Sequence, residues 1–196
     1  MSEAYDWNPM PHKVDIKCPS CNGHAVFEFA EIVRIEEKKD VPFFESSDTF
    51  DYHIFKDSCG HKWHGAIYYP LLHGGSIKAI SSLPEGYEPE NWSHSKYLMR
   101  NHGLDLGAFN CTSCHARQKH MLNWPNDAYY SITYKGQQLW AFNRESSVDL
   151  RNFIESSDRK TGNYKWSGFL LHIPTAFKKQ NARDNIVKQI NKLLAV

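Results

Sequence analysis

Short apolar runs separated by polar turns dominate the first half of the chain and predict β-strands. Four of these runs combine β-branched with aromatic residues, at positions 25–29, 32–35, 51–55 and 66–72. Runs of this length and composition are typical of strands. We therefore expect the first half to fold into small antiparallel β units.

The second half predicts one hairpin. Tyr130, Ile132 and Tyr134 alternate along one face of a strand, and Lys135-Gly136 supplies a tight turn before a returning strand at 139–142. A two-residue connection that contains glycine is a common hairpin turn.

Two later segments predict helices. Ser146 or Ser147 can cap a helix that runs to Ile154. From Asn181 onward, apolar residues recur at spacings typical of one face of an α-helix. They are Ala182, Ile186, Val187, Ile190, Leu193 and Leu194. The predicted class is α+β, with small antiparallel β units followed by amphipathic C-terminal helices.

The charge changes sign along the chain, although the net charge is only +1. Residues 1–98 carry 9 basic and 15 acidic side chains, whereas residues 99–196 carry 14 basic and 7 acidic ones. Proline, glycine and glutamate are concentrated in 81–98, as in many linkers. We expect an acidic β-rich domain over 1–80, a linker over 81–98, and a basic domain over 99–196.

The composition favours a cytoplasmic protein that does not contact a membrane. The mean hydropathy is −0.60. No apolar run approaches the roughly 18 residues that a membrane-spanning helix needs. The first residues also lack the basic and apolar regions of a signal peptide.

Five cysteines stand at positions 18, 21, 59, 111 and 114, and four of them form two Cys-x-x-Cys pairs. In a reducing compartment this spacing indicates metal binding rather than disulfides. Residues 18–23, Cys-Pro-Ser-Cys-Asn-Gly, have the form of a zinc knuckle, with Gly23 able to adopt a positive φ after the second cysteine. Cys111 and Cys114 begin a second knuckle. The expected cofactor is structural Zn²⁺, as one or two ions.

A knuckle supplies two ligands, and a closed structural site needs two more. For the first pair we prefer Cys59 and His64, which stand five residues apart. His61 and His53 are alternatives to His64.

Beyond the second pair, only histidines and carboxylates remain to complete a site. We prefer His120, and the competing histidines are His94, His102 and His115.

A different pairing also fits the spacing. Cys18, Cys21, Cys111 and Cys114 would then form a single four-thiolate site, and the residues between the two pairs would be an insertion. In that arrangement Cys59 would be a buried thiol. We prefer two separate sites to this single one.

The first half resembles the zinc-ribbon superfamily, in which CPxC is followed, after a hairpin, by CxxCGHxW. Residues 18–21 and 59–63 match this pattern, whereas Lys56 stands where the second knuckle would begin with cysteine. The resemblance implies a structural zinc ion in a small antiparallel β unit. In the second half, residues 122–130 and 139–145 are similar to segments of uncharacterised bacterial proteins that follow a CxxC pair, a likeness that implies no activity.

Signatures of catalysis are sparse. Cys114-His115 resembles the end of HNH nucleases, but Ser93-His94-Ser95 lacks the acidic neighbour that such a site uses to activate water. No histidine has a glutamate two places later, as zinc deaminases require, and the glycine-rich phosphate motifs are missing. We favour a non-catalytic protein and keep an HNH-like metal-dependent nuclease as a third interpretation.

Basic residues of the second half point to nucleic acid. Between Arg159 and Lys192 there are eight basic residues and one acidic residue, enough to neutralise several phosphates. Trp124 and Trp166 are candidate stacking rings. The candidate contacts to DNA or RNA are Arg117, Lys119, Lys165, Lys178, Lys179, Lys188 and Lys192.

We therefore expect a structural-zinc module that binds nucleic acid as part of a larger assembly. The alternative function is a protein-interaction subunit, an adaptor or assembly factor, without nucleic-acid contact.

Overall fold

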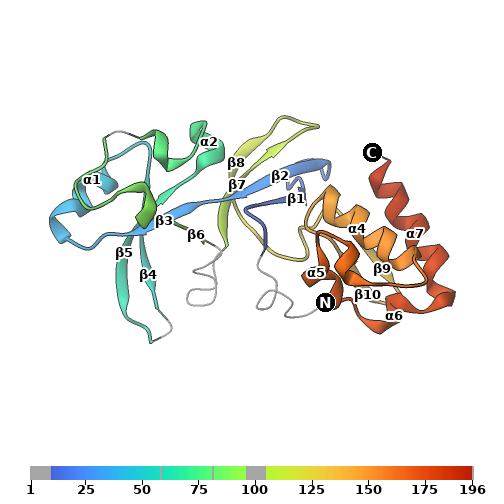
Figure 1. Ribbon diagram of the computed structural model, residues 1–196. Coiled ribbons are helices and arrows are strands. Elements are labelled where there is room, and N and C mark those ends of the chain that lie inside the picture. Colours follow the sequence, from blue (N-terminus) through green and yellow to red (C-terminus); the bar gives the residue numbers. More distant parts are fainter. Residues whose placement is uncertain (1–9, 58, 81, 96–104, 196) are drawn as a thin grey trace. The chain divides into compact units, whose positions relative to one another are not determined.

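The computed structural model describes residues 10–57, 59–80, 82–95 and 105–195. It confirms the α+β class, with two four-stranded antiparallel sheets, one two-stranded sheet and several helices (Figure 1). The chain divides into two compact units, one made of Met1–His24 with Trp124–Val196 and the other of Ala25–Asn123. The described residues of the predicted linker, 82–95, are assigned to the second of these units.

The two larger sheets contain the strands β1 to β8. One sheet has the strand order β1-β2-β7-β8 and the other has the order β4-β5-β3-β6. The strands of the first sheet are β1 (Lys13–Lys17), β2 (His24–Phe29), β7 (Leu106–Cys111) and β8 (Arg117–Met121). Those of the second are β4 (Asp51–Lys56), β5 (Lys62–Tyr68), β3 (Glu31–Arg34) and β6 (Ser93–His94).

Three of the four predicted strand runs, 25–29, 32–35 and 51–55, correspond to β2, β3 and β4. The fourth predicted run, 66–72, is a strand only in part. The strand β5 ends at Tyr68, and the short helix α2 (Pro70–His73) follows it. Proline fits the first turn of a helix, where its missing N–H costs nothing. The apolar residues of 66–72 are therefore shared between a strand and a helix.

Aromatic rings fill the core of the Ala25–Asn123 unit. In one cluster, Phe44 of the helix α1 (Val41–Glu45) contacts Phe50 and Trp92. In another, the rings of Phe55 and Trp63 stack with their centroids 4.5 Å apart. Short 3-10 helices connect these elements at η1 (Lys38–Asp40), η2 (Ile77–Ala79) and η3 (Pro89–Asn91).

The predicted hairpin of the other unit is confirmed. It consists of β9 (Ser131–Tyr134) and β10 (Gln137–Trp140), with Gln137 opposite Tyr134. Lys135 and Gly136 both have positive φ, 50° and 75°, as the mirror-image turn of a two-residue hairpin requires.

The helices of this unit follow the hairpin. They are α4 (Arg144–Glu155), α5 (Ser167–Leu171), α6 (Thr175–Lys178) and α7 (Gln180–Leu194), with the 3-10 helix η5 (Thr161–Asn163) after α4. On α7, Ala182, Ile186 and Ile190 are buried, which confirms the predicted apolar face. None of the helices in the described ranges combines the length and the apolar composition that crossing a bilayer requires.

The start of α4 differs from the prediction. Its N-cap is Asn143, whose side-chain oxygen accepts a hydrogen bond from the Ser146 amide at 2.9 Å. The Ser146 hydroxyl accepts in return from the Asn143 amide at 3.0 Å. Ser146 therefore closes a reciprocal capping box from inside the helix, and is not the cap itself.

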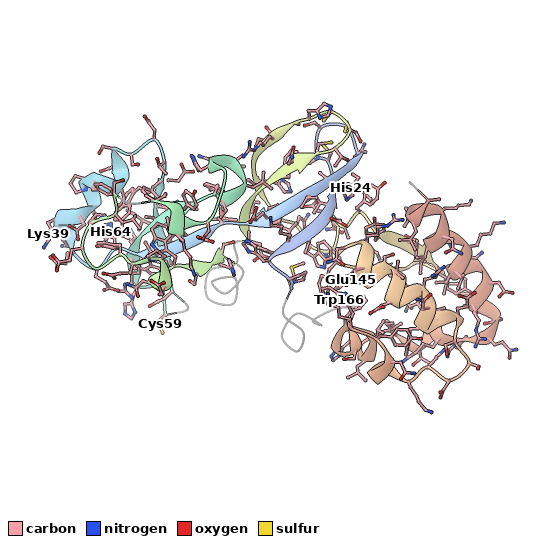
Figure 2. All side chains as sticks on the ribbon, turned by 45° about the horizontal axis from the view of Figure 1, so that its top comes forward. His24, Lys39, Cys59, His64, Glu145 and Trp166 are labelled. Carbon is pink, nitrogen blue, oxygen red and sulfur yellow. The ribbon has the colours of Figure 1, made fainter. Side chains whose placement is uncertain are left out.

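Rings also build the core of this unit. Trp140, Phe142 and Phe169 are almost fully buried. Trp124, a predicted stacking ring, packs against Trp140 and Phe142 and is 9% exposed, so it belongs to this core. Trp166 lies at its edge, where its indole N–H donates to Glu145 at 3.3 Å (Figure 2).

Candidate metal centre

Strand pairing brings the two Cys-x-x-Cys turns to one end of a sheet. Cys18 and Cys21 lie in the turn between β1 and β2, and Cys111 and Cys114 lie at the turn between β7 and β8. β2 pairs with β7 in antiparallel register, with Ala25 opposite Cys111. Since the start of one antiparallel strand lies beside the end of its neighbour, both turns are at the same end of the sheet.

Gly107 permits this close pairing of β2 with β7. A Cβ atom at position 107 would come within 2.3 Å of the Glu28 carbonyl oxygen and of the Phe27 ring. Real Cβ atoms do not approach other atoms that closely, so only glycine fits opposite Phe29 in this register.

The first turn has the geometry of a metal-binding knuckle. The Cys18 amide donates to the Gly23 carbonyl at 2.8 Å, which closes the turn. The amides of Ser20 and Gly23 point at the sulfurs of Cys18 and Cys21, both at 3.4 Å. N–H groups directed at sulfur stabilise the negative charge of a thiolate.

The second turn repeats the first. The Cys111 amide donates to the Ala116 carbonyl at 2.9 Å, and the Ser113 and Cys114 amides lie 3.3 and 3.4 Å from the Cys111 sulfur. The two turns close alike, and in each the amide two residues after the first cysteine points at the sulfur of that cysteine.

A left-handed residue follows the second cysteine of each turn. Asn22 has a φ of 59° and His115 a φ of 60°. Asparagine and histidine are among the side chains that tolerate this region best. The sequence suggested Gly23 for this role, and the structure assigns it to Asn22. His115, a competing ligand in the sequence, has this backbone role and an exposed side chain.

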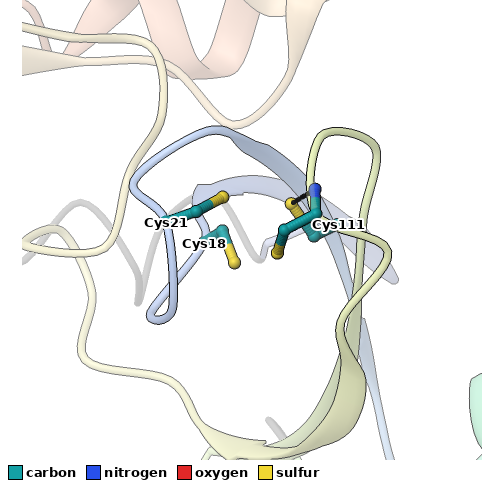
Figure 3. A group of neighbouring side chains, drawn as sticks. Cys18, Cys21 and Cys111 are labelled. Carbon is teal, nitrogen blue, oxygen red and sulfur yellow. Dashed lines mark hydrogen bonds between the residues drawn. The ribbon is translucent and has the colours of Figure 1, made fainter.

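The four cysteines of the two turns form one cluster. Their sulfur atoms all lie within 4.8 Å of one another, with separations of about 3.5–3.7 Å. Figure 3 shows Cys18, Cys21 and Cys111 with their sulfurs close together. Cys18 and Cys111 are buried, at 0% and 1% exposure, whereas Cys21 and Cys114 are exposed.

This cluster fits a tetrahedral metal ion. Four sulfurs, each about 2.3 Å from a central ion, are about 3.8 Å apart at the corners of a regular tetrahedron. The observed separations are close to that value. The cluster can therefore hold one metal ion with four sulfur ligands, as in the single-site pairing that the sequence left open.

The two histidines preferred from the sequence lie outside this cluster. His64, on β5, lies with its Nδ1 2.5 Å from the Tyr52 hydroxyl (Figure 2). His120, on β8, packs edge-on against the rings of Phe27 and Phe109. Among the described residues, the group of potential ligands around Cys111 contains neither of them.

The alternative histidines are also dispersed. His53, on β4, packs against Phe55 with a centroid distance of 4.8 Å, and His94 pairs with Glu31 between β6 and β3. His102 lies outside the described residues.

Cys59 belongs to a second group of potential ligands, at the tip of the β4–β5 hairpin (Figure 2). Its partners there are Asp57 and His61, and it is exposed rather than buried as the single-site pairing assumed. The backbone N–H of His61, above all, lowers the pKa of Asp57. The sequence prediction missed Asp57. An aspartate two residues before a Cys-Gly turn is the signal that marks it.

The predicted nucleic-acid contacts divide into two groups. Arg117 donates to the Leu71 carbonyl, Lys119 forms an ion pair with Asp51 at 2.7 Å, and Lys165 forms one with Glu145 at 2.9 Å. Within the described ranges, the other four make no ion pair. These are Lys178, Lys179, Lys188 and Lys192, on or beside α6 and α7.

Comparison with known proteins adds no relative: no family model matches the chain, and neither the curated proteins nor the solved structures include a match.

Proposed function

We propose that the four clustered cysteines bind one structural zinc ion, and that the protein is a non-catalytic module that binds nucleic acid through α6 and α7. The four-sulfur cluster is the observation that carries the metal assignment. Thiolates in a tetrahedral arrangement favour zinc over the hard ions magnesium and calcium. With four protein ligands, no coordination position remains for a substrate, which favours a structural role.

A bound zinc ion would cross-link the two Cys-x-x-Cys turns. The chain's own contribution is to hold the four thiolates with N–H groups and with the pairing of β2 and β7. Binding at such a site contributes on the order of 10 kcal/mol at neutral pH, comparable with the whole stability of a domain.

Native mass spectrometry of the purified protein tests the metal assignment. We expect one zinc per chain and loss of that zinc in Cys18→Ser and in Cys111→Ser alike. A double variant, Cys18→Ser with Cys111→Ser, that loses twice as much zinc as either single variant would instead show that the two pairs form separate sites.

The uncompensated lysines of α6 and α7 support the nucleic-acid part of the proposal. A groove of about 540 Å³ runs along α7 and is lined by Arg183, Lys188 and Lys192, together with Glu155 and Asp184. Lysines that form no ion pair with a carboxylate are available to bind phosphates. When they do so, counterions are released from the nucleic acid, which favours binding.

Two arginines near this groove add to the positive potential. The Nε atoms of Arg159 and Arg183 are buried and have no hydrogen-bond partner within the described part of the chain. Burial lowers the pKa of Arg159, and the charge of Arg183 lowers it further. A phosphate oxygen would relieve this repulsion and satisfy a buried donor.

Salt-dependent binding to oligonucleotides tests this part. Replacing Lys178, Lys179, Lys188 and Lys192 with alanine should weaken binding and flatten the slope of log K against log salt by about 3 to 4 units. The control carries four lysine-to-alanine changes elsewhere, at the exposed positions 38, 56, 62 and 78. Equal weakening in both variants, or no salt-sensitive binding at all, would contradict the nucleic-acid role and favour a protein partner.

A further inference from the structure

A tight turn joins β4 to β5 and holds three potential metal ligands. The hairpin closes with Lys56 opposite Lys62, and the Asp57 amide donates to the His61 carbonyl at 2.9 Å. The Gly60 amide donates to the Asp57 carbonyl, also at 2.9 Å. These bonds fix the backbone from which Asp57, Cys59 and His61 project.

This turn shares two features with the cysteine knuckles. The Cys59 amide donates to Asp57 Oδ1 at 2.9 Å, the same two-residue relation as that between the Ser20 amide and the Cys18 sulfur. Asp57 thus takes the place of the first knuckle cysteine. Gly60, directly after Cys59, has a φ of 84°, as Asn22 has a positive φ after Cys21.

The donor atoms are already close enough to share an ion. His61 Nδ1 lies 3.2 Å from Asp57 Oδ2, and the three potential ligand atoms all lie within 4.8 Å of one another. Nitrogen and oxygen ligands, each about 2.0–2.1 Å from a tetrahedral zinc ion, are about 3.3–3.4 Å apart. The Cys59 sulfur belongs to this group as it stands, and its side chain is exposed.

From this geometry we propose that Asp57, Cys59 and His61 form a second metal site, which binds a borderline divalent cation such as Zn²⁺ or Co²⁺ with one thiolate, one imidazole and one carboxylate. On binding, the Cys59 thiol releases its proton to solvent, and neutral His61 coordinates through Nδ1 with its own proton on Nε2. The fourth coordination position faces solvent and holds water or an external ligand.

This site should bind a metal ion more weakly than the four-cysteine cluster does. It has three protein donors instead of four, its ligands are largely exposed, and two lysines, Lys56 and Lys62, flank it. Each of these features weakens the binding of a cation. The metal at this turn should therefore exchange readily with the medium, whereas the ion bound by the four cysteines should not.

Cobalt titration of the zinc-loaded protein tests the proposal. Added Co²⁺ should bind as a second equivalent, visible by native mass spectrometry as one zinc plus one cobalt, with a sulfur-to-cobalt charge-transfer absorption. Cys59→Ser should abolish that absorption and weaken cobalt binding at least tenfold, and His61→Gln should weaken it similarly. His64→Gln, a change on the adjacent strand outside the ligand set, should bind cobalt as the unmodified protein does.

Two results would overturn the proposal: no second equivalent bound by the unmodified protein, or equal cobalt affinity in Cys59→Ser. Neither result bears on the four-cysteine site, because the zinc content measured in the same spectra reports on that site separately. Loss of the zinc itself from Cys59→Ser would show instead that Cys59 is a ligand of the first ion, which also contradicts a separate site.

Discussion

The Cys18–Gly23 turn and the Asp57–His61 turn are built alike and differ in their surroundings. In both turns, the backbone amide two residues after the first ligand donates to the side chain of that ligand. In both, the residue directly after a cysteine has a positive φ. The first turn lies beside an equivalent turn, with buried Cys18 and Cys111 between them. The second lies at a hairpin tip and has no such neighbouring turn within the described ranges.

The difference shows how strand pairing decides what a metal-binding turn can do. The register of β2 and β7 supplies the first turn with two further thiolates and shields half of the ligands from water. Such a site is closed and suited to holding structure. The hairpin tip has no partner turn in the described residues, so its site is open and suited to reversible binding.

Metal removal should give the largest difference in stability between the two kinds of turn. Stripping the four-cysteine site with a strong chelator should lower the free energy of unfolding by several kcal/mol, up to the order of 10 kcal/mol. Thermal unfolding with and without chelator measures the effect. An unchanged melting curve, with the metal shown to be gone, would contradict a structural role.

The next largest effect should come from the strand pairing beneath the cluster. Gly107→Ala places a Cβ against the Glu28 backbone and should cost about 1–3 kcal/mol, because the strands must shift. Zinc affinity should fall with stability. Gly75→Ala is the matched control, since a Cβ there meets nothing within 4 Å. Denaturant unfolding of both variants tests whether the register supports the metal.

The left-handed residues should have a smaller effect. Asn22→Val should cost about 1–2 kcal/mol, because a β-branched side chain is strained at positive φ, while Asn22→Gly should cost nothing. Gly60→Val should show a similar strain. Only the change at position 22 should lower zinc affinity, as measured by competition with a colorimetric chelator. Equal loss of zinc from Gly60→Val would remove the distinction between the turns.

The smallest effect is expected for Cys59→Ser. Its side chain is exposed and outside the four-cysteine cluster, so the melting temperature and the tightly bound zinc of that cluster should not change. A calorimetric scan together with metal analysis checks both quantities. A substantial drop in either would place Cys59 in the structural core of the metal site.

Local patterns were sufficient to predict the hairpin of β9 and β10, the apolar face of α7 and the two Cys-x-x-Cys turns. The pairing of the cysteines was not predictable, because it depends on the register of β7 against β2. β7, with the sequence Leu-Gly-Ala-Phe-Asn-Cys, contains a glycine and an asparagine, which are uncommon in strands. β8, with the sequence Arg-Gln-Lys-His-Met, has no apolar alternation that would mark it as a strand.

The histidines preferred as ligands are not members of the four-cysteine group in the described residues. His64 and His120 have suitable spacing from cysteines, yet both lie within strands, where their rings pack beside Tyr52 and Phe109. Spacing along the sequence does not determine which face of a strand a side chain occupies when the register is unknown.

X-ray absorption at the zinc edge tests the central claim most directly, on zinc-loaded Cys59→Ser protein so that the hairpin turn cannot contribute sulfur. The account predicts one zinc per chain with four sulfur neighbours at about 2.3 Å and no nitrogen in the first shell. A mixed shell of sulfur with nitrogen at about 2.0–2.1 Å would contradict it, because a single site made of Cys18, Cys21, Cys111 and Cys114 contains no histidine.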